Sequence, residues 1–366
     1  MKVLQLGKFY PIRGGVEKVM FDLTRGLSEH GVKCDMLCAC VREDMPEGGE
    51  IALNGNGRVI CRPALFKAAA TMICPSMAFW LRKYGRDYDI IHVHHPDPMA
   101  CLALWMSGFK GRVVLHWHSD ILKQKTLLKF YKPFQSWLVR RADLILGTTP
   151  VYVKDSPWLK DVQDKVDYLP IGIEPVGEAS VEDDGLKTVF SLGRLVGYKG
   201  YSYLVDAASF LPDDYQIVIA GEGPLKEELL AQIESKGLQN KVRLLGRIST
   251  EEKKEWYNRC SVFCLSSIWK TEAFAIVQIE AMSCGKPVVA TRIKGSGVSW
   301  VNAGGQSGMN VGTCDSKALA DAILAVTSDD QAYGQFCRNA RDRYEKLFTL
   351  DSMIEGCMAF YEKLNQ

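Results

Sequence analysis

The chain has 366 residues, which is enough for two domains of ordinary size, and its formal net charge is only +2. A domain that binds nucleic acid is usually strongly basic, so this charge balance argues against nucleic acid as a partner. With 47% hydrophobic and 24% charged residues, the composition is that of a globular protein and not of a disordered one.

The N-terminal residues, MKVLQLGKFYPIRGG, do not read as a signal peptide, and no apolar run is long enough to span a membrane. The twelve cysteines include no CxxC pair, which argues against zinc clusters and thioredoxin-type sites. Most of them lie in apolar runs, where cysteine behaves as a small buried hydrophobe. We therefore expect a cytoplasmic protein with reduced thiols.

The N-terminal half alternates short apolar runs with segments of helical periodicity. Val3–Leu6 predicts a buried strand, a loop with Gly14 and Gly15 follows, and apolar residues then recur at helical spacing up to Leu27. Further strands are expected at Lys33–Val41, Val59–Cys61, Ile90–His94, Val113–His116 and Leu144–Thr148. Strands separated by helices predict a parallel sheet.

The same pattern begins again at residue 188. Further strands are expected at Thr188–Leu192, Gln216–Ala220, Val242–Leu245, Val262–Leu265 and Pro287–Ala290, and helices at Tyr201–Phe210, Val326–Phe348 and Ser352–Leu364. The acidic, turn-rich segment 173–187 predicts a linker. The sequence thus predicts an α/β protein with two Rossmann-like, doubly wound domains, 1–172 and 188–348, followed by a terminal helix at 349–366. Ligands bind such sheets at the carboxyl ends of the strands, so we expect a site in a cleft between the two domains.

The most specific motif is the segment EAFAIVQIEAMSCGKP at 272–287, in which Glu272 and Glu280 lie eight positions apart around the start of a predicted helix. A carboxylate can accept hydrogen bonds from adjacent hydroxyls, so the pair could hold a ribose and a hexose. A solvated acid followed by an ordinary helix glutamate is the alternative. The turn Gly285-Lys286-Pro287 into a strand favours the functional interpretation.

A second motif, GRLVGYKG at 193–200, follows a predicted strand directly. Arg194 offers a planar guanidinium and Lys199 a point charge, and both suit a diphosphate. Two solvated cations on a surface loop are the alternative, but the position at the carboxyl end of a strand favours phosphate binding. Gly14 and Gly15 are a weaker signal of the same kind, because many turns between a strand and a helix contain glycine.

Five of the six histidines fall into two short runs, with His92, His94 and His95 in one and His116 and His118 in the other. Alternation along a strand places His92 with His94 on one face, and His116 with His118. No acidic or cysteine partner with ligand spacing accompanies them, so no metal site is expected. For His92 and His116 a core position is as good an interpretation as a functional one. His118 ends its strand, and we expect it to bond a sugar or to act as an acid or base.

Asp87-Tyr88-Asp89 has the D-x-D form that metal-dependent glycosyltransferases use. It precedes a strand and is therefore expected at the amino edge of the sheet, away from ligands. We interpret it as a loop.

Residues 121–141 contain six cations and no acid. At ~100° per residue, one helical face carries Lys125, Lys129, Lys132 and Arg140, the opposite face carries Leu127, Tyr131, Phe134 and Leu138, and Phe130 and Trp137 lie between them. Either the apolar face packs on the sheet and the cations are solvated, or the cations contact an anionic membrane surface.

These motifs together resemble the retaining GT-B glycosyltransferases of family 4. The resemblance rests on Gly-Arg-Leu…Lys-Gly at 193–200, Glu-x7-Glu at 272–280, Gly-Gly before the first helix, and the segments 170–174 and 281–287, and so spans nearly the whole chain. One departure is GSGVSWVN at 295–302, which has no acid where many relatives have Gly-Gly-x-Pro-Glu.

The resemblance implies a role for each motif residue. Arg194 and Lys199 would bind the donor diphosphate, Glu280 the ribose and Glu272 the donor sugar, while His118 would lie near the transferred sugar. Further donor contacts are expected from Gly14, Gly15 and Phe274, and the terminal helix would return onto the N-terminal domain.

The implied reaction moves a hexose from a nucleotide-diphosphate sugar to a hydroxyl of a glycan or lipid-linked acceptor, with retention and without a metal or other cofactor. Assembly of envelope polysaccharide or lipopolysaccharide at the cytoplasmic side of a membrane is the implied setting. A sugar-nucleotide epimerase of the same fold and a non-catalytic nucleotide-sugar-binding protein are the alternatives.

Overall fold

The computed structural model describes the whole chain except residues 13, 42–44, 46, 69–70, 122–124 and 182–184, and it describes no side chain for residues 68, 125–128 and 130. The chain divides into two compact units. Unit 1 comprises Met1–Gly172 together with Leu350–Gln366, and unit 2 comprises Ile173–Thr349. The segment 173–187 groups with unit 2, where Ile173 forms an isolated bridge to Thr349.

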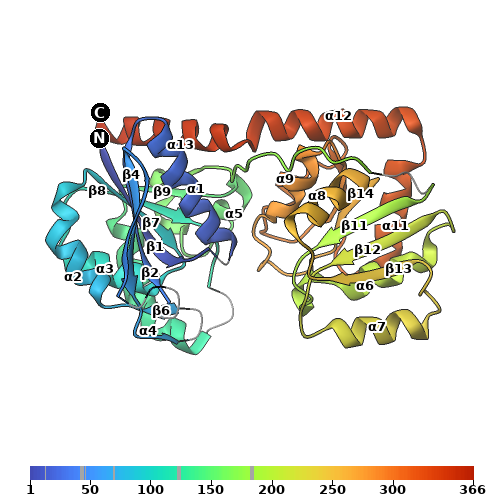
Figure 1. Ribbon diagram of the computed structural model, residues 1–366, viewed down its shortest axis with the longest axis horizontal. Helices are drawn as coiled ribbons and strands as arrows, with labels where there is room; N and C mark the ends of the chain where they lie inside the picture. The colour runs from blue at the N-terminus through green and yellow to red at the C-terminus, as the bar shows by residue number, and fades with distance from the viewer. Residues whose placement is uncertain (13, 42–44, 46, 69–70, 122–124, 182–184) are drawn as a thin grey trace. The chain divides into compact units, whose positions relative to one another are not determined.

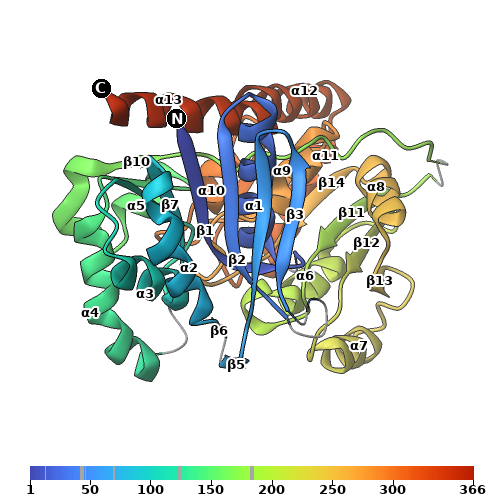
Figure 2. The same cartoon turned by 60° about the vertical axis from the view of Figure 1, so that its left-hand side comes forward.

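Unit 1 is built on an eight-stranded sheet in the order β10-β9-β8-β7-β1-β2-β4-β3 (Figures 1 and 2). Its strands are β1 (Lys2–Tyr10), β2 (Lys33–Cys40), β3 (Gly49–Asn54), β4 (Gly57–Pro63), β7 (Ile90–His95), β8 (Arg112–Trp117), β9 (Leu144–Gly147) and β10 (Val166–Tyr168). Every neighbouring pair is parallel except β3 and β4. A separate two-stranded sheet pairs β5 (Phe66–Ala68) with β6 (Thr71–Ile73).

Helices cover both faces of this sheet, with α1 on one face and α2 and α3 on the other (Figure 1). The winding reverses at β1, which lies between β2 and β7, so right-handed crossovers place α1 and α3 on opposite faces. The helices are α1 (Gly15–Glu29), α2 (Ser76–Tyr84), α3 (Pro98–Ser107), α4 (Lys125–Arg141), α5 (Pro150–Lys154) and α13 (Leu350–Asn365), with 3-10 turns η1 (Gly85–Asp87) and η2 (Lys160–Lys165).

The terminal helix α13 packs against α1. A Cβ atom at Gly26 of α1 would lie 2.5 Å from Ile354 Cδ1, so the two helices meet where a glycine leaves room. Tyr361 of α13 is fully buried, and its hydroxyl reaches the sheet at Gln5 and His92. Helix α13 is therefore part of the core of unit 1.

Unit 2 has a six-stranded, wholly parallel sheet in the order β13-β12-β11-β14-β15-β16. Its strands are β11 (Lys187–Leu192), β12 (Tyr215–Ala220), β13 (Val242–Gly246), β14 (Val262–Leu265), β15 (Val288–Thr291) and β16 (Gly308–Val311). Its helices are α6 (Tyr201–Ala207), α7 (Lys226–Ser235), α8 (Thr250–Arg259), α9 (Ile276–Ser283), α10 (Val298–Val301), α11 (Ser316–Thr327) and α12 (Asp330–Leu347), with η3 (Gly197–Lys199) and η4 (Ala208–Phe210).

Two expected helices differ from the structure at their ends. The segment expected as one helix, Val326–Phe348, contains the end of α11 and all of α12, because the Asp329 side chain accepts from the Ala332 amide (2.7 Å) and starts a new helix. The helix expected at Tyr201–Phe210 ends at Ala207 and continues as the 3-10 turn η4.

Candidate active site

The sheet of unit 2 reverses its winding at β11, which lies between β12 and β14. The loop that follows β11 ends in η3, and the segment that follows β14 is bonded to it. Ser266 Oγ donates to the Lys199 carbonyl (2.9 Å), and the Ile268 amide donates to the Tyr198 carbonyl (2.8 Å). The GRLVGYKG motif and the chain that leads to Glu272 therefore meet at the carboxyl edge of the sheet, where doubly wound folds bind ligands.

The loop after β12 lies very close to the GRLVGYKG loop. Gly221 has a φ of +139°, and a Cβ atom there would lie 1.9 Å from the Gly193 carbonyl oxygen. At Gly223 a Cβ atom would lie 2.4 Å from the Leu195 carbonyl oxygen. Both positions require glycine, so Gly221-Glu222-Gly223 supports the first loop by close backbone packing.

Lys199 and Glu272 form an ion pair, with 2.6 Å between Lys199 Nζ and Glu272 Oε2. Their side chains are only 9% and 10% exposed. Ser267 Oγ donates to the same carboxylate oxygen (2.8 Å), and Ser296 Oγ donates to the Glu272 carbonyl. The structure thus brings together residues that the sequence assigned to different parts of the donor, and fixes Glu272 through both its side chain and its backbone.

Arg194 comes from the same loop but is exposed. Within the part of the chain that the structure describes, its guanidinium has no hydrogen bond or ion pair. Lys199, by contrast, is paired with Glu272. The five N–H donors of the Arg194 guanidinium are therefore available to an anionic ligand at the carboxyl edge of β11.

Glu280 is held by two side chains of α8. Lys253 Nζ lies 2.9 Å from Glu280 Oε1, and the Tyr257 hydroxyl donates to Oε2 (2.7 Å). Burial, together with the neighbouring Glu280 carboxylate, raises the pKa of Tyr257 well above its ordinary value, so the phenol stays protonated and donates. Each carboxylate oxygen keeps a second lone pair, so Glu280 can still accept from a ribose hydroxyl.

Phe274, expected at the donor site, is only 3% exposed, and its ring packs edge-on against Phe348 (5.9 Å between centroids). A ligand contact from this residue would therefore come from its backbone. The neighbouring Ala275 has a φ of +63° and precedes α9, so the chain enters this helix through a left-handed conformation that is unusual for alanine.

Gly14 and Gly15 mark the start of α1 in unit 1. Gly14 is the residue before the helix, and Gly15 is its first residue. A Cβ atom at Gly14 would lie 2.4 Å from Glu17 Oε2, so the carboxylate of Glu17 lies beside this end of the helix. Glu17 is 8% exposed, and an anionic ligand at this helix end would have to approach its charge.

The sheet face that carries Gln5 of β1 also carries His92 and His94 of β7 and His116 of β8, and His118, which directly follows β8, stacks on them. Their rings stack, with centroids 4.9 Å apart for His92 and His94, 5.2 Å for His94 and His118, and 4.0 Å for His116 and His118. His118 is 5% exposed and the other three are fully buried.

A chain of hydrogen bonds runs through part of this stack. His118 Nε2 lies 2.9 Å from His94 Nδ1, and His94 Nε2 lies 2.7 Å from Gln5 Oε1. Separately, His92 Nδ1 lies 2.6 Å from the Tyr361 hydroxyl. Among the described residues, both ring nitrogens of His116 and Nδ1 of His118 have no partner.

Burial lowers the pKa of these imidazoles, because the charged form would be poorly solvated. The pKa of His94 and that of His118 fall well below 6.5, with neighbouring histidines and Lys8 adding to the effect of burial. The pKa of His116 falls to about 3 through burial alone. The stack is therefore neutral near pH 7.

Ring nitrogens of His92, His94 and His116 lie within 4.8 Å of one another, so these are the described residues that could hold a metal ion. His94, however, already uses both ring nitrogens in hydrogen bonds. The stacked rings also direct their lone pairs side by side and not toward a common point. The arrangement fits a hydrogen-bonded stack better than a ligand set.

The D-x-D segment lies at the opposite edge of the sheet of unit 1. Asp89 directly precedes β7 and accepts from the Lys2 amide (2.7 Å) at the start of β1. A cavity of about 810 Å³ lies at this amino edge and includes Asp89, Arg86 and Arg112 in its wall. Neither belongs to the carboxyl edge of this sheet, where His118 directly follows β8.

Two family comparisons cover most of the chain. Residues 13–175 match the family described as Glycosyltransferase Family 4, and residues 175–343 match the family described as Glycosyl transferases group 1. The chain is also 31% identical over 379 aligned residues to the O-antigen chain mannosyltransferase C of Escherichia coli, an alignment that covers 100% of this chain and 99% of that protein. The chain belongs to glycosyltransferase family 4.

Other relatives and solved structures agree with this assignment. The glycosyltransferase is 30% identical to the D-rhamnosyltransferase WbpZ of Pseudomonas aeruginosa, over 95% of this chain and 92% of that one. Its fold matches Anabaena HepE in complex with UDP, with a TM-score of 0.77 at 18% identity over 99% and 100% of the two chains. It also matches the lipopolysaccharide outer core galactosyltransferase WaaB, with a TM-score of 0.71 at 18% identity over 99% and 100%. The predicted GT-B fold of two Rossmann-like domains is confirmed.

The cation-rich segment 121–141 of this glycosyltransferase lies mostly in α4. Residues 122–124, with Lys123, and the side chains of Lys125, Leu127 and Phe130 are outside the described residues. Of the rest, the apolar face packs inward, with Tyr131 and Leu138 buried and Phe134 half-buried, while Lys129, Lys132 and Arg140 are exposed. The apolar face thus packs inward as the first interpretation expects, and the exposure of the cations is compatible with either interpretation.

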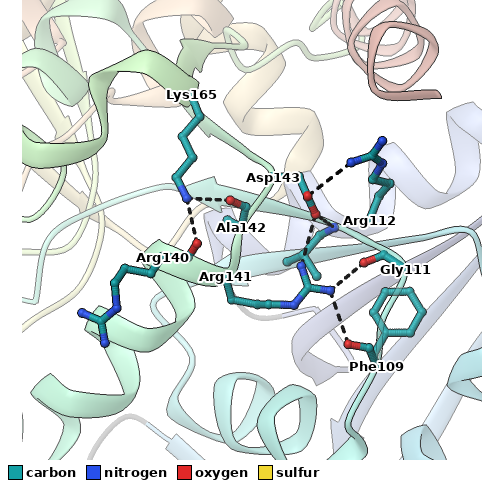
Figure 3. A network of polar contacts seen from close by, with 9 residues as sticks. Phe109, Gly111, Arg112, Arg140, Arg141, Ala142, Asp143 and Lys165 are labelled. Atoms are coloured by element: carbon teal, nitrogen blue, oxygen red, sulfur yellow. Dashed lines mark hydrogen bonds and ion pairs between the residues drawn. The ribbon is translucent and has the colours of Figure 1, made fainter. Parts of the chain in front are cut away.

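The C-terminal end of α4 is fastened by its own polar network (Figure 3). Arg141 donates to the carbonyls of Phe109 (3.3 Å) and Gly111 (2.6 Å) and pairs with Asp143 (3.2 Å). Lys165 Nζ donates to the Arg140 carbonyl (2.9 Å). Arg141 therefore serves the fold, whereas the Arg140 side chain points away from this network (Figure 3). Nowhere in the described ranges is there a helix both long and apolar enough to cross a bilayer.

Sequence reasoning missed Ser267 and Ser296, which hold Glu272, and four residues that hold Glu280 or the histidine stack. Lys253 and Tyr257 lie on a polar surface helix, and nothing in their spacing points to Glu280. Tyr361 lies in the terminal helix, far along the chain from the strands that it contacts. Gln5 did carry a signal, because it is the one polar residue in the apolar run Val3–Leu6.

Proposed function

We propose that the chain transfers a hexose from a nucleotide-diphosphate sugar to a hydroxyl of a saccharide or lipid-linked acceptor, with retention of configuration. The observation that carries this proposal is the pair Lys199–Glu272 beside the exposed Arg194 at the carboxyl edge of β11. As the glycosidic bond breaks, charge develops on the diphosphate, and preorganised cations stabilise it. Arg194 and Lys199 supply two such cations.

The carboxylates have separate roles in this proposal. Glu280, oriented by Lys253 and Tyr257, accepts from the ribose, while Glu272, oriented by Lys199 and Ser267, accepts from the donor sugar. By their names, one relative is an O-antigen chain mannosyltransferase and the other a D-rhamnosyltransferase, and the first name supports an envelope polysaccharide as the setting. Twelve free cysteines support work in the reducing cytoplasm.

We infer that the reaction needs no metal ion, because the two cations can carry the charge that a metal would otherwise neutralise. Activity is then expected to be unchanged by EDTA. Strict dependence on manganese or magnesium would contradict this part of the proposal.

A donor panel tests the proposed reaction. UDP, GDP and ADP sugars are compared by thermal stabilisation and by hydrolysis, and the preferred donor is then offered to candidate acceptors. An epimerised sugar from donor alone would support the epimerase, and tight binding without turnover would support the non-catalytic protein. In Glu280→Ala, the bare nucleoside diphosphate should bind about 1.5–3 kcal/mol more weakly through loss of a charge-assisted bond. Glu255→Ala, an exposed glutamate on α8, is the control.

We further propose that the exposed cations of α4 rest on an anionic membrane surface. Lys129, Lys132 and Arg140 remain in solvent after the apolar face has packed inward, and each cation near such a surface contributes about 1 kcal/mol. A lipid-linked acceptor would make this position useful, because α4 follows the segment of His118.

A further inference from the structure

The histidine stack contains a hydrogen-bond chain whose direction can be worked out. Gln5, His94 and His118 come from three adjacent segments of the sheet, and all three side chains are buried. Gln5 Nε2 donates to the Tyr361 hydroxyl (3.0 Å) and lies 3.8 Å from Cys34 Sγ, so its carbonyl oxygen Oε1 faces His94.

A carbonyl oxygen only accepts, so His94 Nε2 must carry the proton in the bond to Gln5. A neutral imidazole has one N–H and one lone pair, which leaves His94 Nδ1 as an acceptor. The partner of that acceptor, His118 Nε2, must then be the donor. His118 Nδ1 is left with a lone pair; this nitrogen is buried, and no described residue bonds to it.

We propose that Gln5 and His94 are positioning residues that fix His118 as its Nε2–H tautomer, so that His118 Nδ1 presents a lone pair to a hydroxyl of the transferred sugar. The proposal rests on the proposed function, in which His118 lies near that sugar. It adds the direction of the bond: the sugar donates and His118 accepts. His118 binds and orients the sugar and is not an acid in this scheme.

The groups around this hydrogen-bond chain keep the imidazoles of His94 and His118 neutral. The groups that face His118 and His94 are the imidazoles of His92, His95 and His116 and the ammonium of Lys8, all of which oppose protonation. Tyr361 holds the Gln5 amide from the side opposite His94, so the C-terminal helix takes part in setting the tautomer. A positively charged His118 would instead present N–H groups on both sides and repel a donor hydroxyl.

The tautomer can be read directly in the full-length protein without any substrate. In ¹⁵N-histidine-labelled protein, two-bond ¹⁵N–¹H NMR spectra distinguish the Nε2–H from the Nδ1–H form of each ring, and His118→Asn assigns the signal. We expect the Nε2–H form in wild type and loss of that preference in Gln5→Leu, which removes the acceptor at nearly constant volume. Gln5→Glu keeps an acceptor and should retain the tautomer.

Activity provides the second readout. Gln5→Leu should lower kcat/KM by roughly 10- to 100-fold, by analogy with groups that orient a metal-ligating histidine, and Gln5→Glu should recover most of it. Gln216→Leu is the matched control, because it removes another buried glutamine, in unit 2, whose bond goes to Thr188. It should cost stability without changing the His118 signal.

Three results would overturn the proposal: an Nδ1–H form of His118 in wild type, an unchanged tautomer in Gln5→Leu, or Gln5→Glu as inactive as Gln5→Leu while keeping the tautomer. A different result would contradict the proposed function: the wild-type protein would transfer no sugar. In that case the spectra still decide whether Gln5 and His94 set the tautomer.

Discussion

Arg194 and Lys199 belong to one loop and carry the same charge, yet their surroundings differ. Arg194 is exposed, whereas the Lys199 ammonium lies in a nearly buried pair with Glu272. Removing one partner of such a pair leaves an uncompensated charge in the interior, which is strongly destabilising. The two cations can therefore be separated by their effects on stability, although both are expected to act on the diphosphate.

Both Arg194→Ala and Lys199→Ala should lower turnover by about 10²–10³-fold, because each removes a preorganised donor. Only Lys199→Ala should also lower the free energy of unfolding, by about 3–5 kcal/mol. Transfer assays and calorimetry check the two effects, with Lys317→Ala as an exposed-lysine control. The double variant Lys199→Ala/Glu272→Ala should regain stability but not activity. Equal melting temperatures for the two single variants would contradict the role given to the ion pair.

At the scale of residues, the sequence was informative where a motif is local. Lys199 and Glu272 could be assigned because each follows a strand in a recognisable segment, and their roles stay predictions. Their direct contact could not be foreseen, because it depends on how the chains leaving β11 and β14 are bonded together. The partners of Glu280 are hidden for the same reason, since Lys253 and Tyr257 are ordinary residues of a surface helix.

Among the elements, helix α4 has one apolar face that packs inward and one face of exposed cations, which we propose to contact a membrane. Wild type should bind anionic vesicles, release them at high salt and ignore neutral ones, because the contact is electrostatic. Lys129→Gln with Lys132→Gln should weaken this binding by roughly 1 kcal/mol per cation removed. Co-sedimentation measures it.

A matched control for this experiment is Lys226→Gln with Lys236→Gln, two cations at the ends of α7 in unit 2. If the α4 variant sediments with anionic vesicles as strongly as wild type, this face is not the membrane contact.

The strands that were missed are short or atypical. β3 alternates between half-buried and exposed residues and is antiparallel, so it lacks the apolar run that marks a buried parallel strand. β10 and β16 have only three and four residues, and their pairing is decided by the neighbouring strand. The central strands were found because burial on both faces leaves a continuous apolar run.

For the molecule as a whole, the buried histidines make stability depend on pH. The pKa values of His92, His94 and His118 lie well below 6.5, and those of His95 and His116 are about 3, in each case mainly through burial. Below pH 6.5 the unfolded chain therefore binds protons that the native chain does not. The free energy of unfolding should fall as pH falls from about 6.5 toward 3, by up to about 1.4 kcal/mol per pH unit for each imidazole.

Denaturant unfolding of unit 1 at pH 7.5, 6.5 and 5.5 checks this prediction. His116→Leu should flatten the dependence without lowering stability at pH 7.5, because neither nitrogen of His116 has a partner among the described residues. His30→Gln, an exposed histidine, should leave the slope unchanged. A slope that is the same in His116→Leu and wild type would show that other groups cause the acid sensitivity.

The division of the chain predicts how fragments behave. Unit 2 is continuous, so residues 173–349 should unfold cooperatively on their own. Residues 1–172 lack α13, which leaves Gly26 of α1 uncovered and Gln5 and His92 without Tyr361. This fragment should aggregate or unfold without a cooperative transition, and fusing residues 350–366 to it through a flexible linker should restore one. Circular dichroism melts decide it. A stable, cooperative fragment 1–172 would show that α13 is dispensable.

The placement of α13 also bears on synthesis at the ribosome. Unit 1 begins the chain but cannot bury Tyr361 until the final residues emerge. At about 5–20 residues per second, translation of unit 2 leaves the first unit without its last helix for on the order of ten seconds or more. Unit 2, although made later, can complete its fold first. A nascent chain that stalls before Leu350 would therefore display an unfinished N-terminal half, which marks it for chaperones and proteases.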